Sequence, residues 1–169
     1  GFVFNVGEKV EGYSNFLWVL WGAAALKIGV EPSLAIRALG ILSGLLCLPL
    51  AWDISRRLLT KTPWSALLAP AILAVTPPLA RHATNGLETL FFTFLVTFTM
   101  WLVTVGSRPV RNLVLVFALV AMALTRPEGF IFAFLFLIPF LPGKPSAWFG
   151  QPDVGSFRNR GWLVIAGFV

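Results

Sequence analysis

The chain has 169 residues, of which 57% are apolar and only 12% are charged, whereas roughly 25% of the residues in an ordinary soluble domain are charged. A compact domain of this size leaves much of its surface exposed and cannot hide so many Leu, Phe and Trp side chains, which argues against a water-soluble globule. The net charge of +6 is explained by membrane topology, and we expect a lipid bilayer rather than a nucleic acid as the partner.

Uninterrupted apolar runs predict an all-α fold, a polytopic bundle of transmembrane helices. About 20 apolar residues, at 1.5 Å per residue, cross a hydrocarbon core of about 30 Å. The first run, residues 15–29, is short and carries Trp18 and Trp21. We expect it to form an interfacial or re-entrant helix, although a span is the alternative. Three longer runs are predicted spans: 33–52, 64–80 and 87–105.

Two shorter apolar runs, 112–125 and 130–142, are separated by Arg126-Pro127-Glu128-Gly129. A single helix through both runs would bury Arg126 and Glu128 in mid-membrane with a proline between them, so two segments are predicted. The single cysteine, Cys47, and the single histidine, His82, exclude a disulfide framework and a Cys/His metal cluster. No cofactor is evident, and no ligand cluster supports a metal.

Basic residues cluster in three connections, which the positive-inside rule places in the cytoplasm. These residues are Arg56, Arg57 and Lys61, then Arg108 and Arg111, then Lys144, Arg158 and Arg160. The turns near Asn85 and Pro127 then open to the outer face. We expect one transmembrane domain with four parts: 1–32 as external loop and interfacial helix, 33–142 as transmembrane helices, 143–160 as a cytoplasmic loop and 161–169 as the start of a further helix.

Polar side chains at membrane depth are costly, so the few polar clusters are the candidate site. One cluster, before residue 16, mixes groups that suit a sugar: Glu11, Tyr13 and Asn15. A second contains Asn85 in a predicted turn and Glu88 at the start of an apolar run, where its carboxylate would also favour the helix dipole.

The third cluster is Arg126 with Glu128, in a segment that Pro127 and Gly129 prevent from being helical. A guanidinium facing an outer cavity can bind a lipid phosphate through two parallel hydrogen bonds. The alternative is a structural ion pair between Arg126 and Glu88 or Glu128.

Three motifs occur in the order found in membrane glycosyltransferases of the multi-spanning C-type fold: GFVFNVGEKVEGYSNFLW, NGLETLFF and ALTRPEGF. The chain most resembles the branch that contains the terminal arabinofuranosyltransferases. This resemblance implies transfer of a monosaccharide from a polyprenyl-phosphate donor to a glycan, lipid or protein acceptor, on the outer face of the bacterial cytoplasmic membrane. It also allows a divalent metal.

The resemblance further implies that the general base is an acidic residue upstream of Gly1, so the catalytic residue is unknown and the chain is expected to be a fragment, truncated at both ends and inactive alone. Arg126 is expected to bind the donor phosphate. The expected substrate-binding residues, which contact the sugar or shape its cavity, are Glu11, Tyr13, Asn15, Asn85, Glu88 and Glu128. Competing hypotheses are a transporter or flippase for lipid-linked sugars and a non-catalytic membrane subunit.

Overall fold

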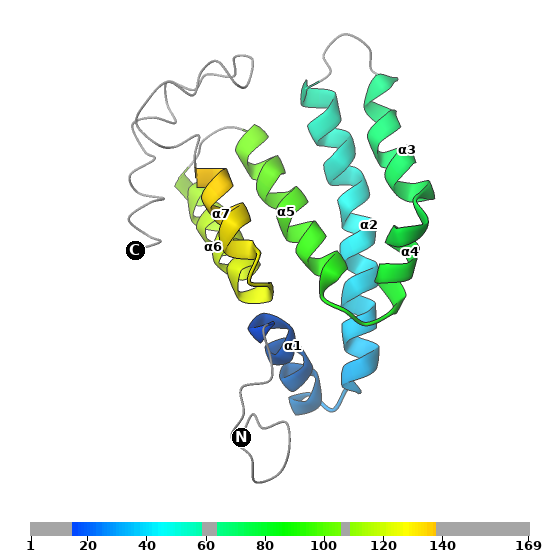
Figure 1. Cartoon of the computed structure of the whole chain (residues 1–169), viewed down its shortest axis with the longest axis vertical. Helices are drawn as coiled ribbons and strands as arrows, with labels where there is room; N and C mark the ends of the chain where they lie inside the picture. The colour runs from blue at the N-terminus through cyan, green and yellow to red at the C-terminus, as the bar shows by residue number, and fades with distance from the viewer. Residues whose placement is uncertain (1–14, 59–63, 106–108, 138–169) are drawn as a thin grey trace.

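The computed structural model describes residues 15–58, 64–105 and 109–137. These residues form seven α-helices and one short 3-10 helix, with no strand among them, which confirms the all-α prediction. The elements in chain order (Figure 1) are α1 (Phe16–Lys27), α2 (Pro32–Leu58), η1 (Ser65–Leu67), α3 (Leu68–Val75), α4 (Pro77–Thr84), α5 (Thr89–Thr104), α6 (Pro109–Thr125) and α7 (Gly129–Leu137).

Helix α2 is the longest element of the bundle. Its 27 residues contain the whole predicted span 33–52 and continue through Asp53 to Leu58. Among the described residues, α2 is the one helix that is long and apolar enough to cross a membrane by itself. Helices α4 and α5 reach that length only together, and they are bent by 118° at their junction. The described part of the chain therefore contains one clear candidate span, or two if the bent pair forms one.

The predicted span 64–80 is not a continuous helix. Helix α3 ends at Val75, and Thr76 has an extended backbone with φ −75° and ψ 114° before α4 begins at Pro77. A residue before proline is disfavoured in the helical region, whereas proline is well suited to the first position of a helix. Pro77 therefore ends one helix and starts the next, which the apolar composition of the run concealed.

Helix α5 lies at the centre of the bundle, between α2 and the α6–α7 pair (Figure 1). The buried core packs α5 against α6 and α7 through apolar side chains, among them Leu95, Leu102, Leu119 and Met122. Ile36 and Leu39 of α2 pack against this core. The predicted break at 126–129 is confirmed, because α6 ends at Thr125 and α7 begins at Gly129 and runs back along α6.

Helix α1 lies beside the start of α2 and near the end of α6, and its 12 residues are too few to cross a bilayer. The two tryptophans that suggested an interfacial position differ in their surroundings. Trp21 is exposed, but Trp18 is buried, with its ring centroid 5.8 Å from that of Phe91. Trp18 therefore anchors α1 to α5.

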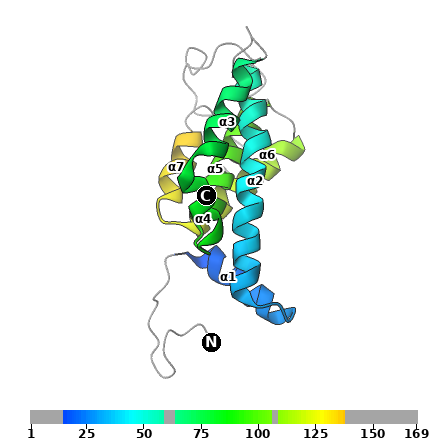
Figure 2. The same cartoon turned by 90° about the vertical axis from the view of Figure 1, so that its right-hand side faces the viewer.

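The turns of the bundle gather at two ends, as Figures 1 and 2 show. One end holds α1, the α4–α5 turn and the α6–α7 turn, and we call it the Arg126 end. The other holds the last residues of α2 and α5 and the first residues of α6, and we call it the Asp53 end. The polar side chains that matter for function are divided between these two ends.

Candidate functional site at the Arg126 end

Three segments that are distant in sequence bring polar side chains into contact at the Arg126 end. The Asn15 amide nitrogen donates a hydrogen bond to Glu88 Oε2 at 3.2 Å. The other oxygen of that carboxylate, Oε1, lies 3.8 Å from Arg126 Nε, and Arg126 Nη2 lies 3.4 Å from Glu128 Oε1. Four of the predicted site residues thus form one cluster, which we call the Arg126 cluster.

Each member of the Arg126 cluster lies at a helix end, where the chain turns. Asn15 precedes α1, Glu88 precedes α5, and Arg126 follows α6. Neither Asn15 nor Glu88 caps its own helix with its side chain. Their polar groups are therefore directed at each other and at Arg126, and the predicted role of Glu88 at the helix dipole is at most part of its function.

The Arg126 guanidinium has two carboxylate neighbours, and both contacts are loose. A tight charge-assisted hydrogen bond measures about 2.7–2.9 Å, whereas the two contacts of Arg126 measure 3.8 Å and 3.4 Å. The guanidinium carbon also lies 5.8 Å from the ring centroid of Phe92, a cation–π distance. With a side chain 33% exposed, Arg126 can accept a further anionic partner. The two ion pairs predicted from the sequence as the alternative role of Arg126, with Glu88 and with Glu128, are nevertheless both present.

The α4–α5 turn that carries Glu88 is fixed to α1. Trp18 Nε1 donates a hydrogen bond to the Gly86 carbonyl oxygen at 3.2 Å. Gly86 has φ +75°, a conformation that glycine adopts without steric cost, which confirms the predicted turn. Helix α1 therefore holds this turn both at its backbone and, through Asn15, at the Glu88 side chain.

Asn85, a further predicted site residue, does not join the Arg126 cluster. The Asn85 side chain is exposed and contacts its own turn, with Nδ2 3.4 Å from His82 Nδ1. Glu11 and Tyr13 lie outside the described residues. His82 lines a separate hollow of about 170 Å³ between α3, α4 and α5, whose other lining residues are Leu73, Thr76, Pro78, Leu79, Thr89, Leu90 and Thr93.

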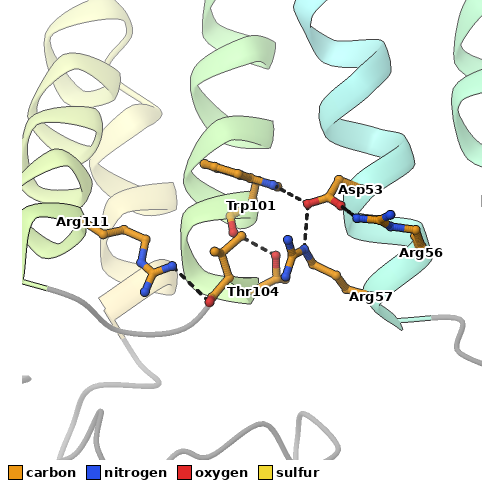
Figure 3. Close-up of polar contacts among 7 residues, drawn as sticks. Asp53, Arg56, Arg57, Trp101, Thr104 and Arg111 are labelled. Carbon is orange, nitrogen blue, oxygen red and sulfur yellow. Dashed lines mark hydrogen bonds and ion pairs between the residues drawn. The ribbon is translucent and has the colours of Figure 1, made fainter.

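The Asp53 end carries a network that the sequence did not reveal (Figure 3). Trp101 Nε1 donates to Asp53 Oδ2 at 2.8 Å, and Arg56 and Arg57 contact the same carboxylate, each at 2.7 Å. Arg111 Nη1 donates to the Val105 carbonyl oxygen at 3.0 Å. The one available signal was Asp53 itself, an acidic residue among predicted inner basic residues. The bond between Trp101 and Asp53 joins α5 to α2.

The sequence supports no metal site, although the family resemblance allows a divalent metal. Within residues 15–58, 64–105 and 109–137, no group of three or more His, Cys, Asp or Glu side chains is placed to hold a metal ion. The two carboxylates of the Arg126 cluster, Glu88 and Glu128, both contact Arg126.

The described residues form an apolar helical bundle in which charged side chains lie at the two ends and one helix is long and apolar enough to cross a bilayer. The chain belongs to the dolichyl-phosphate-mannose-protein mannosyltransferase family, which matches residues 15–152. No curated protein and no solved structure matches the chain. Members of this family are integral membrane glycosyltransferases that use a lipid-linked sugar donor, so the predicted glycosyltransferase class is confirmed.

Proposed function

We propose that the chain forms part of an enzyme that moves a monosaccharide from polyprenyl phosphate to an envelope glycan, lipid or protein, and that Arg126 binds the donor phosphate. The observation that carries the proposal is the position of the Arg126 guanidinium. It is partly exposed at a helix break, with its two carboxylate contacts longer than tight ion pairs. A phosphate can bind this guanidinium in a shorter, bidentate geometry.

The chemistry explains why a cation is needed at this place. When an acceptor hydroxyl attacks the anomeric carbon, the bond to the departing polyprenyl phosphate breaks and negative charge grows on the phosphate oxygens. A fixed guanidinium stabilises that charge more in the transition state than in the ground state, which accelerates the reaction. Because Glu88 and Glu128 both contact Arg126, neither is assigned as the general base.

The proposed sugar contacts lie around the Arg126 cluster. Glu128 and Asn85 are exposed on neighbouring turns at this end, so their side chains can reach sugar hydroxyls. Asn15 and Glu88 are half-buried and joined by a hydrogen bond, which suits residues that shape the site. Glu11 and Tyr13 complete the proposal as hydroxyl-binding and ring-stacking groups.

We place the Arg126 end at the outer face of the bacterial cytoplasmic membrane and the Asp53 end at the cytoplasmic face. Arg56 and Arg57, both exposed, lie at the end that the positive-inside rule assigns to the cytoplasm. The proposed domain then has 1–32 outside and 33–142 as transmembrane helices, and its remaining proposed parts, the loop 143–160 and the helix start 161–169, lie outside the described residues. The exposed Leu side chains along α2, such as Leu42 and Leu45, suit lipid contact.

The family description and the sequence motifs favour different classes of donor sugar. The family is named for mannose, a hexose, whereas the three sequence motifs resemble the arabinofuranosyl branch and favour a pentose. The two donors to compare are therefore polyprenyl-phosphate mannose and polyprenyl-phosphate arabinose, assayed with the full-length protein in membranes. The donor that supports transfer to endogenous acceptor identifies the class.

The phosphate role is tested by Arg126→Ala and Arg126→Lys in the full-length protein. Loss of a preorganised donor to developing charge costs on the order of 100-fold or more in turnover, so Arg126→Ala should lower transfer at least that much. Arg126→Lys, which keeps the charge but not the fork, should fall between Arg126→Ala and the wild type. Arg81→Ala, an exposed arginine on α4, is the matched control. Near-normal transfer by Arg126→Ala would refute the role.

A further inference from the structure

The half-buried contact between Asn15 and Glu88 needs an explanation, because neither side chain caps its helix. The Glu88 carboxylate uses its two oxygens differently: Oε2 accepts from Asn15 at 3.2 Å, and Oε1 lies 3.8 Å from Arg126 Nε. A carboxylate held from one side in this way presents its other oxygen in a defined place. The orientation of the Arg126 guanidinium thereby depends on Asn15, which precedes helix α1, through Glu88.

Glu128 differs from Glu88 although it bears the same charge. It lies two residues from Arg126 on the same turn, its side chain is 54% exposed, and it contacts Nη2, at the end of the guanidinium. Glu88 is 15% exposed and contacts Nε, at the stem of the group. A phosphate that binds the Nη edge would therefore replace Glu128 and leave Glu88 in position.

We propose that Asn15 and Glu88 are positioning residues for Arg126, and that Glu128 is a resident counter-ion which the donor phosphate displaces. This inference rests on the proposed function, since it concerns how Arg126 is prepared for phosphate. Asn15 acts through Glu88, and Glu88 acts through Arg126. Trp18, bonded to the Gly86 carbonyl oxygen, keeps the turn that bears Glu88 against α1 and supports the same arrangement.

Substitutions of the two glutamates are expected to change phosphate binding in opposite directions, which distinguishes a positioning role from a purely electrostatic one. Removing either negative charge near a phosphate site strengthens phosphate binding by Coulomb interaction alone. If Glu88 positions Arg126, Glu88→Gln must weaken binding despite that gain. Glu128→Gln must strengthen it, because a competitor is lost. Asn15→Ala changes no charge, so any weakening that it causes has another origin.

The experiment measures binding of farnesyl phosphate to the purified full-length protein in detergent, with farnesol as the uncharged reference. The ratio of the two affinities reports phosphate recognition, because loss of the fold or of the isoprenoid contact changes both ligands together. We expect Asn15→Ala and Glu88→Gln each to lower this ratio about tenfold, as for the loss of about 1.4 kcal/mol, and Glu128→Gln to raise it. In an Arg126→Ala background, Asn15→Ala should have no further effect on the ratio.

The outcomes distinguish the inference from the proposed function. If Arg126→Ala itself leaves the ratio unchanged, the phosphate role of Arg126 is wrong and the inference fails with it. If Arg126→Ala lowers the ratio but Asn15→Ala does not, the phosphate role stands and the positioning role is overturned. A rise of the ratio in Glu88→Gln, like that in Glu128→Gln, also overturns it, because both glutamates would then act only as charges.

Discussion

At the scale of single residues, Gly129 illustrates how closely the backbone near Arg126 is packed. Helix α7 begins at this glycine, directly against the last turns of α6. A Cβ atom added to Gly129 would meet the carbonyl oxygen of Met122 and would lie 2.9 Å from the Ala123 Cα. Because these are backbone atoms, neither can rotate away, and the α6–α7 hairpin would have to open.

We therefore expect Gly129→Ala to destabilise the protein by roughly 1–3 kcal/mol, the usual cost of forcing extra atoms into a packed region. The midpoint of thermal unfolding of the detergent-purified full-length protein measures this cost. Gly22→Ala is the control, since its Cβ would lie at an ordinary 3.6 Å from Ile36 Cδ1. Equal unfolding midpoints for the two variants would contradict the close approach of α6 and α7.

The sequence predicted the residues of the Arg126 cluster but not the distances between them. It named Asn15, Glu88, Arg126 and Glu128, and it offered both a phosphate site and an ion pair as roles for Arg126. The structure contains the ion pairs, but with loose distances. Residue type alone cannot tell a saturated guanidinium from one that can still bind an anion, because the difference is about 0.5–1 Å in donor–acceptor distance.

At the scale of elements, helices α2 and α5 are joined at the Asp53 end by a side-chain hydrogen bond. Trp101 Nε1 donates to Asp53 Oδ2 at 2.8 Å, across 48 positions of sequence. The Trp101 ring also stacks on Phe98, with centroids 5.9 Å apart. A phenylalanine at position 101 would keep the stacking and lose only the hydrogen bond to the carboxylate.

We expect Trp101→Phe to lower the free energy of unfolding by about 1.5–3 kcal/mol, because hydrogen bonds to charged groups are worth roughly that much. Chemical unfolding of the full-length protein in mixed micelles checks this value. The same substitution at Trp52, which is exposed and contacts Arg56 only through its ring face, should cost less. No loss for Trp101→Phe beyond that of Trp52→Phe would contradict a bond that joins α2 to α5.

The element that the sequence predicted least well is the run 64–80. Its composition met the length criterion for a span, and prolines are tolerated in membrane helices where neighbours satisfy the backbone. The backbone instead turns at Thr76, and two helices result. The Pro77-Pro78 pair was the available signal, because two consecutive prolines remove two backbone donors at one point.

At the scale of the whole molecule, the arrangement of the two ends makes a test of sidedness possible. Asn85 and Pro127 are both exposed at the Arg126 end, whereas Arg57 is exposed at the Asp53 end. The native Cys47 is fully buried and should not react. Cysteines placed at these three positions therefore report on the two faces of the membrane.

A membrane-impermeant maleimide added to intact cells should label Asn85→Cys and Pro127→Cys. It should label Arg57→Cys only after the membrane is permeabilised, because the positive-inside rule places that end in the cytoplasm. Labelling of Arg57→Cys alone in intact cells would invert the proposed orientation. Equal labelling of all three positions in intact cells would contradict a bundle that spans the membrane between its ends.

The sequence by itself predicted lipid surroundings and an all-α fold, because both follow from composition. It also predicted the helix break around Pro127 and Gly129, because the backbone restrictions of these residues act locally. It also named the family resemblance through three short motifs. Only the tertiary structure decided that Asn15 meets Glu88, 73 positions away, and that the same carboxylate faces Arg126. Helix periodicity is a local signal, whereas the packing of helix ends depends on how all the helices fit together.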